Sequence, residues 1–167
     1  MGNAVLALCP RWLLLVEGVG GDPGATGLPR GANGNLFWGE QLGGAKRSPV
    51  RLTNPRKLAY SPHVYGPGFP SRMPYYDTVR SQYDKRATID HELGSRWEQH
   101  FGFLSPTSPI LIGEIGGKFD TAEDRSWQEW AISYAARRGF GVYYFCLNPN
   151  SHDTYARPRP LSELTDY

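Results

Sequence analysis

Short apolar runs alternate along this chain with longer segments of mixed polarity. Four of the runs are bounded by glycine, proline or polar residues, a pattern typical of buried strands in a parallel sheet. We predict strands over residues 12–16, 57–60, 109–112 and 141–145. The first run is continuously apolar, so we expect that strand to be buried on both faces.

Two longer segments between these strands have a helical pattern. In residues 80–100, Leu93 and Trp97 are four positions apart and fall on one helix face. Residues 123–138 carry an apolar stripe, and Gly139 follows as a natural helix stop. The stripe consists of Trp127, Trp130, Ala131 and Tyr134. We expect its tryptophans to belong to the core.

The segment before residue 57 is less regular. Residues 1–8 are predicted to end a helix, because Pro10 cannot continue it. Residues 18–44 are rich in glycine and form a long loop, a feature usually kept for function. Trp38 lies on this loop. It could stack on a sugar ring or pack beneath the loop, and the sequence favours neither.

Alternating strands and helices predict parallel pairing and an α/β fold. The predicted strands end in polar or acidic residues: Glu17, His63 with Tyr65, Glu114 and Asn148. In open α/β sheets and (β/α)8 barrels, the carboxyl ends of parallel strands meet at one face and form the site. The sequence therefore predicts a functional site built from these strand ends.

Composition narrows the class of protein. The 167 residues suffice for one domain, and 40% of them are hydrophobic, enough for a packed core. A net charge of +2 is too small to indicate nucleic-acid binding. Pro10-Arg11 divides the apolar residues near the amino terminus, so we identify neither a signal peptide nor a membrane span. Two cysteines cannot form a dense disulfide framework, and neither has metal-ligand spacing.

Glu114 is the most informative acidic residue. Gly113 precedes it and further glycines follow, so a ligand could approach its carboxylate closely. The alternative is a solvated acid at a strand end. His63 and Tyr65 are two positions apart and share one side of an extended segment, where they could hold a carboxylate ionised. An ordinary pair of loop residues is the alternative for them.

Four segments that occur in this order carry a family resemblance. They are Val16-Glu17-Gly18, Tyr60-Ser61-Pro62-His63-Val64-Tyr65-Gly66-Pro67, Gly113-Glu114-Ile115-Gly116-Gly117 and Leu147-Asn148-Pro149-Asn150-Ser151 with Asp153-Thr154. Together they resemble successive signatures of glycoside hydrolase family 5, with the greatest likeness to its cellulase (endo-β-1,4-glucanase) members. The resemblance covers about residues 2–154.

The resemblance implies a retaining glycosidase on a (β/α)8 barrel that needs no metal or other cofactor. Glu114 matches the catalytic nucleophile at the end of strand seven, and His63 and Tyr65 match residues of strand six that orient it. Phe145 stands where the family usually has the tryptophan that floors the cleavage subsite. Asn148 and Trp38 are our further candidates for substrate binding.

The same resemblance implies that strands one to four of the barrel are absent. A (β/α)8 domain needs about 250 residues, and this chain matches the half with strands five to eight. A retaining mechanism needs two carboxyl groups about 5–5.5 Å apart. The family keeps its general acid/base after strand four, in the missing half. Glu17 ends strand five, but that motif is not the family's acid, so we assign Glu17 no role.

We therefore interpret residues 1–156 as a partial catalytic domain and residues 157–167 as a divergent tail. The expected activity is hydrolysis of β-glucan or cellulose, lost in this chain alone. Alternatives are a non-catalytic remnant that binds glucan, or a half barrel that assembles with another chain. We expect self-association through open sheet edges, and no nucleic-acid or membrane partner. The resemblance implies an extracellular full-length parent, while the location of this chain stays open.

Overall fold

The structure is a computed structural model, which describes residues 1–20, 38–67 and 86–146. No helix in these ranges is long and apolar enough to cross a membrane. The elements are α1 (Gly2–Leu8), β1 (Leu14–Glu17), the 3-10 helices η1 (Gly43–Lys46) and η2 (Pro55–Lys57), β2 (Leu58–Ser61), β3 (His63–Tyr65), α4 (Arg86–His100), the 3-10 helix η4 (Gly102–Leu104), β4 (Leu111–Gly116), α5 (Ala122–Arg138) and β5 (Gly141–Tyr144).

All strand pairs are parallel, as the alternation of strands and helices predicts. Strand β1 pairs with β2, and β3, β4 and β5 form a three-stranded sheet with β4 in the centre. A parallel bridge between Tyr60 and Ile110 joins the two sheets. The chain therefore builds four adjacent strand positions, of which β2 and β3 together occupy one.

The second predicted strand is longer than expected and is interrupted at Pro62. Proline has no N–H to donate to a ladder, so β2 ends before it and β3 begins after it. The carbonyl of Pro62 still accepts a hydrogen bond from the N–H of Gly113, at 2.9 Å. This break lets β2 pair with β1 while β3 pairs with β4.

Two predictions about individual strands are wrong. The third strand does not end before Glu114, because β4 continues to Gly116 and places Glu114 within the strand. The first strand is not buried on both faces: Leu15 is 46% exposed and burial alternates along β1. Its one strand neighbour in the described residues is β2, so its outer edge and part of its faces remain open. Tyr143 on β5, at the other edge, is 60% exposed.

Helix α5 ends before Gly139 as predicted and begins at Ala122, one residue before the predicted start. The side-chain oxygen of Thr121 accepts a hydrogen bond from the N–H of Asp124, which caps the first turn. At the other end Gly139 has φ 69°, the left-handed conformation that glycine adopts without strain. The four residues of the apolar stripe are all buried.

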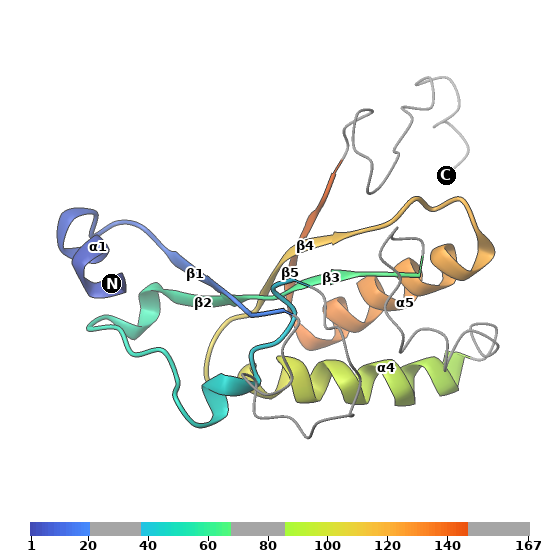
Figure 1. The fold of residues 1–167 in the computed structure, drawn as a ribbon, viewed down its shortest axis with the longest axis horizontal. Helices are drawn as coiled ribbons and strands as arrows, with labels where there is room; N and C mark the ends of the chain where they lie inside the picture. The colour runs from blue at the N-terminus through green and yellow to red at the C-terminus, as the bar shows by residue number, and fades with distance from the viewer. Residues whose placement is uncertain (21–37, 68–85, 147–167) are drawn as a thin grey trace.

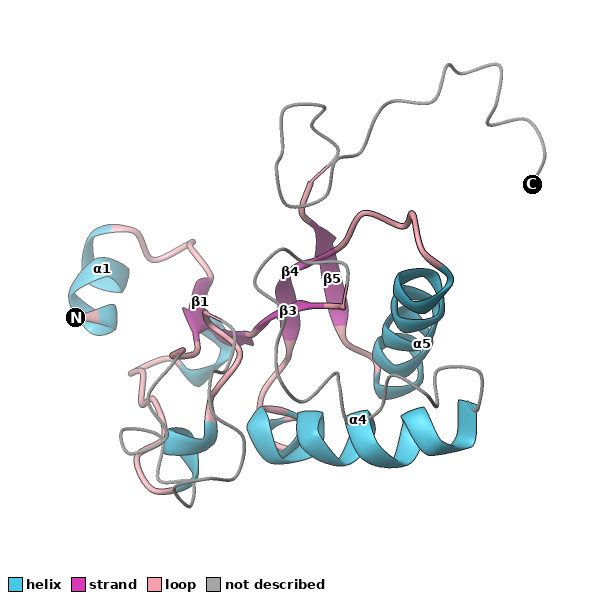
Figure 2. Cartoon of the chain, turned by 45° about the vertical axis from the view of Figure 1, so that its right-hand side comes forward, coloured by secondary structure: helices cyan, strands magenta, loops and turns pink. Residues whose placement is uncertain are grey.

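Helices α4 and α5 lie together on one side of the β3–β4–β5 sheet, while α1 lies apart from them beyond β1 (Figures 1 and 2). Trp97 of α4 is 1% exposed and lies at the centre of their contact. Its ring centroid is 4.9 Å from that of Trp130 and 5.4 Å from those of Phe101 and Tyr134. The core is thus an aromatic cluster between the two helices and the sheet.

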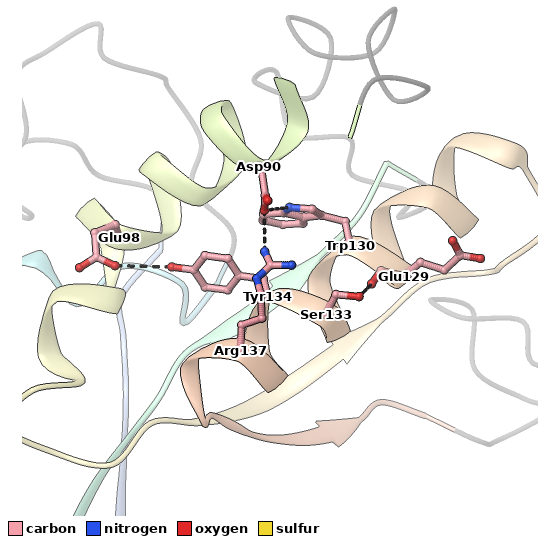
Figure 3. Close-up of polar contacts among 7 residues, drawn as sticks. All are labelled: Asp90, Glu98, Glu129, Trp130, Ser133, Tyr134 and Arg137. Carbon is pink, nitrogen blue, oxygen red and sulfur yellow. Dashed lines mark hydrogen bonds and ion pairs between the residues drawn. The ribbon is translucent and has the colours of Figure 1, made fainter. Parts of the chain in front are cut away.

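Polar contacts at the rim of this cluster fix the two helices relative to each other (Figure 3). Asp90 of α4 accepts hydrogen bonds from the indole N–H of Trp130, at 2.8 Å, and from Arg137, at 2.7 Å. Burial is the main cause that raises the pKa of Tyr134, which lies 3.5 Å from a carboxylate oxygen of Glu98. The phenol therefore stays a hydrogen-bond donor at neutral pH.

Candidate active site

The carboxyl ends of β3 and β4 bring Glu114 and Tyr65 into direct contact. The phenol of Tyr65 donates a hydrogen bond to Oε2 of Glu114, at 2.6 Å. Tyr65 is 2% exposed, whereas the Glu114 side chain is 30% exposed and open to a ligand. A short hydrogen bond to one oxygen fixes the orientation of the carboxylate. Glu114 is thus held by Tyr65 as well as open to solvent, and its role as nucleophile stays a prediction.

His63 lies beside the same carboxylate. Its Nδ1 is 3.6 Å from Oε1 of Glu114, and β3 pairs these two residues in register. The expectation that His63 and Tyr65 share one side of an extended segment is thus confirmed. Gly113 makes room for the imidazole, since a Cβ at this position would lie 2.9 Å from Nε2 of His63. The glycine before Glu114 therefore accommodates a neighbouring side chain.

A short strap, residues 39–42, ties β1 to β3 next to this cluster. The carbonyl of Gly39 accepts hydrogen bonds from the N–H groups of Gly18, at 3.1 Å, and His63, at 3.3 Å. Two further backbone bonds join Val19 and Gln41 in an antiparallel bridge. The strap is thus bonded to the backbone directly after β1 and to the first residue of β3.

A buried pair anchors this strap to α4. Oε1 of Glu40 lies 2.8 Å from Nδ1 of His100, and both side chains are almost fully buried. The N–H of Leu42 also donates to the carbonyl of His100, at 2.9 Å. No local sequence pattern indicates this pair, because its members are 60 residues apart and neither belongs to a recognisable motif.

The structure describes two of the three candidates for substrate binding, and both are exposed. Trp38, directly before the strap, is 79% exposed, so the interpretation that it packs beneath the loop is wrong. Phe145 follows β5, is 39% exposed, and is bonded through its N–H to the carbonyl of Ile115, at 3.0 Å. Asn148 lies outside the described residues, so its position stays a prediction.

Tyr144, the last residue of β5, holds the end of that strand against β4. Its phenol donates to the carbonyl of Gly117, at 3.0 Å. Burial, with a smaller contribution from the Asp124 carboxylate, raises the pKa of Tyr144, so this donor persists at neutral pH. Within the described ranges, no group of three or more His, Cys, Asp or Glu side chains could hold a metal ion. Neither Cys9 nor Cys146 forms a disulfide within the described residues.

Glu17 is the site residue that sequence reasoning left without a role. Its Oε1 lies 3.4 Å from Nδ1 of His63, so the imidazole is close to two carboxylates. The signal was present, because Glu17 is a strand-end acid like Glu114. The family resemblance implies an acid on a different strand, which concerns proton transfer and leaves contact with His63 open.

Comparison with known proteins places this geometry in a family. The sequence pattern described as "Cellulase (glycosyl hydrolase family 5)" matches residues 1–151. The chain is 34% identical over 154 residues to the major extracellular endoglucanase of Xanthomonas campestris pv. campestris, covering 90% of this chain and 29% of that protein. It is 35% identical over 157 residues to an endoglucanase of Paenibacillus polymyxa, covering 92% of this chain and 36% of that protein. The chain thus spans about a third of the length of these relatives.

Solved structures agree with the sequence comparison. The catalytic domain of the Xanthomonas campestris pv. campestris endoglucanase superposes with a TM-score of 0.72 at 31% identity, covering 97% of this chain and 45% of that one. A cellotetraose complex of an endocellulase from Pyrococcus horikoshii has a TM-score of 0.71 at 33% identity, with coverages of 92% and 40%. These matches confirm the expected fold class, the second half of a (β/α)8 barrel, with β1, β2/β3, β4 and β5 as strands five to eight. The chain belongs to the cellulase family of glycosyl hydrolases, family 5.

Proposed function

We propose that this chain supplies the nucleophile half of an active site that hydrolyses β-glucan of the cellulose type. The observation that carries the proposal is the 2.6 Å bond from Tyr65 to Glu114 at the carboxyl end of the barrel strands. It leaves one oxygen of an oriented, accessible carboxylate available for attack. Two relatives that are 34% and 35% identical to this chain over the matched residues are named endoglucanases, which supports this class of substrate.

The proposed reaction is a double displacement at the anomeric carbon. Glu114 attacks that carbon and forms a glycosyl ester, while a general acid protonates the departing glycosidic oxygen. The general acid, now deprotonated, then removes a proton from water. The water attacks the anomeric carbon and releases Glu114 as a carboxylate. We assign the acid/base role to a segment that carries barrel strands one to four. This chain alone is therefore expected to be inactive.

The remaining site residues have supporting roles in this proposal. His63 and Tyr65 orient Glu114 and line the cleavage subsite. Phe145 offers an apolar face to the sugar ring, with less area than a tryptophan and without an N–H donor. Trp38 is exposed enough to stack on a further sugar unit. Asn148 is assigned to the substrate as well, from its place in the sequence motif after β5.

A complementation experiment tests the function. The chain is mixed with the segment of the Xanthomonas campestris pv. campestris endoglucanase that carries strands one to four, a combination called here the completed barrel. Reducing-sugar release from carboxymethylcellulose is measured for each half and for the mixture. We expect hydrolysis from the mixture alone. Robust hydrolysis by this chain without the other half would contradict the assignment of the acid/base.

Tyr65→Phe is expected to lower kcat of the completed barrel by about 10- to 1000-fold, the scale of one hydrogen bond that matters in the transition state. The phenol orients and stabilises the Glu114 carboxylate, whereas the distal sugars contact other residues. KM should therefore change far less than kcat. Steady-state kinetics on one cello-oligosaccharide measure both quantities.

Tyr143→Phe is the matched control for this prediction. Tyr143 lies on β5 and is 60% exposed, and the same hydroxyl is removed without a contact to Glu114. Its kcat should equal that of the unchanged chain. An equal kcat in Tyr65→Phe as well would remove Tyr65 from the site.

A second candidate function is glucan binding without catalysis. The observation that favours it is the 79% exposed indole of Trp38 next to the strand ends, because exposed aromatic faces bind sugar rings by stacking. Affinity electrophoresis in gels containing β-glucan, together with the hydrolysis assay, distinguishes binding alone from catalysis. Retardation of the chain that is lost in Trp38→Ala, without any hydrolysis by the completed barrel, would favour this candidate.

The unpaired strand edges of the sheet favour association with another polypeptide. Leu13 and Leu15 near β1 and Val142 on β5 are exposed apolar side chains, and unpaired strand edges invite association. We therefore propose that residues 1–156 form half a catalytic domain that pairs with a second half or self-associates. Sedimentation of the chain alone measures its self-association, and a monodisperse monomer would contradict self-association. An extracellular location is proposed for the full-length parent, because a relative is named as extracellular.

A further inference from the structure

Glu17 is built into the site from a different strand than its neighbours. It is the last residue of β1, and its carboxylate lies 3.4 Å from Nδ1 of His63. Oε1 of Glu114 lies 3.6 Å from the same nitrogen of His63. The Glu17 side chain is half-exposed and that of His63 is 17% exposed. One imidazole nitrogen of His63 therefore faces two carboxylates.

The strap holds Glu17 in this place. Gly39 has φ 81°, and a Cβ built on it would lie 2.5 Å from Oε1 of Glu17, so a larger residue would displace the carboxylate. The carbonyl of Gly39 bonds the N–H groups of both Gly18 and His63. Gly39 thus holds the backbone of Gly18 and of His63 in place, and its lack of a side chain leaves space for the Glu17 carboxylate.

The charges around Nδ1 determine which form of the ring fits. A bare nitrogen lone pair would face two carboxylate oxygens and be repelled, whereas an N–H is attracted to both. The two carboxylates therefore favour the tautomer that has its proton on Nδ1. With Glu114 as the sole acceptor, that proton would be held less firmly and the ring would be free to turn or exchange tautomers.

We propose that Glu17 is a positioning residue, which shares the Nδ1 proton of His63 with Glu114 and thereby fixes the tautomer and plane of the imidazole beside the nucleophile. The inference deepens the function proposed above and rests on it for its catalytic consequence. Glu17 itself transfers no proton to the substrate. Histidines in enzyme sites are commonly oriented by a carboxylate beside a ring nitrogen.

The ring of His63 reports directly on this role. Imidazole ¹⁵N signals distinguish a protonated from a bare Nδ1. Among the four histidines of the chain, the signals that disappear in His63→Asn belong to His63, and those of His91 are assigned in the same way with His91→Asn. We expect Nδ1–H as the main form, and at least a threefold rise in the other tautomer in Glu17→Ala. Glu17→Gln keeps an acceptor oxygen and should retain most of the original form. Magic-angle-spinning spectra of sedimented protein give the same signals if the chain associates.

Glu92→Ala is the matched control. Glu92 also contacts a histidine, with Oε1 at 3.3 Å from Nδ1 of His91, on the exposed surface of α4. This variant should change the signals of His91 and leave those of His63 unaltered. Unchanged His63 signals in Glu17→Ala would overturn the proposal.

Kinetics of the completed barrel supply the second measurement. Glu17→Ala should lower kcat by about three- to thirtyfold, the range for one hydrogen bond, with KM within about twofold. Glu17→Gln should recover most of the loss. An inactive completed barrel with Glu17 in place would overturn the proposed function, whereas the ¹⁵N spectra still decide on the tautomer. Altered spectra with unchanged kcat would overturn the positioning role.

Discussion

Glu114→Gln is expected to lower kcat of the completed barrel by about 10⁴-fold or more, the scale for losing one member of a cooperating catalytic set. Glutamine has nearly the same shape and can still accept the bond from Tyr65, so the fold should be unaffected. Its amide oxygen is neutral and a poor nucleophile, so the glycosyl ester cannot form. Hydrolysis of a soluble β-glucan by both barrels measures the difference.

Asp120→Asn is the matched control, because it makes the same chemical change at an exposed position between β4 and α5. Its kcat should be unchanged. A covalent trap gives an independent measurement: in a dinitrophenyl 2-deoxy-2-fluoro-cellobioside, dinitrophenolate departs without protonation, and the sugar stays bonded to the carboxylate that attacked. Mass spectrometry should find the label on Glu114. A label on Glu17 would contradict the assignment of the nucleophile.

Much of the fold could be predicted from local patterns, because these patterns have local physical causes. The end of α5 follows from the left-handed preference of Gly139, and the buried stripe follows from helical periodicity. The length of β4 could not be predicted, since its extension to Gly116 depends on the partners His63–Tyr65 across the sheet. The exposure of β1 likewise depends on which strands lie beside it.

The candidate site divides in the same way. Tyr65 and His63 could be placed with Glu114 because alternate residues of a strand share one face, and strand ends in parallel sheets meet. Contacts that run through the strap could not be predicted. The approach of Glu17 to His63 requires Gly39 between two strands, and no local pattern connects these three residues.

Trp97→Ala is expected to destabilise the chain by about 3–5 kcal/mol, the range for removing a large buried aromatic side chain. Trp97 of α4 contacts rings of α5 and the ring of Phe101 and is 1% exposed, so its loss leaves a cavity at the centre of the core. Domains are stable by only about 5–15 kcal/mol. The urea midpoint, followed by far-ultraviolet circular dichroism, should therefore fall strongly or the transition should disappear.

Trp12→Ala separates the effect of packing from that of losing an indole. Trp12 precedes β1 and is 60% exposed, so its removal creates no internal cavity. Surface substitutions of this kind change the free energy of unfolding by about 0.5 kcal/mol or less. The completed barrel should lose activity in Trp97→Ala through unfolding of the sheet that carries Glu114. Equal urea midpoints for the two variants would show that the aromatic cluster does not hold the helices against that sheet.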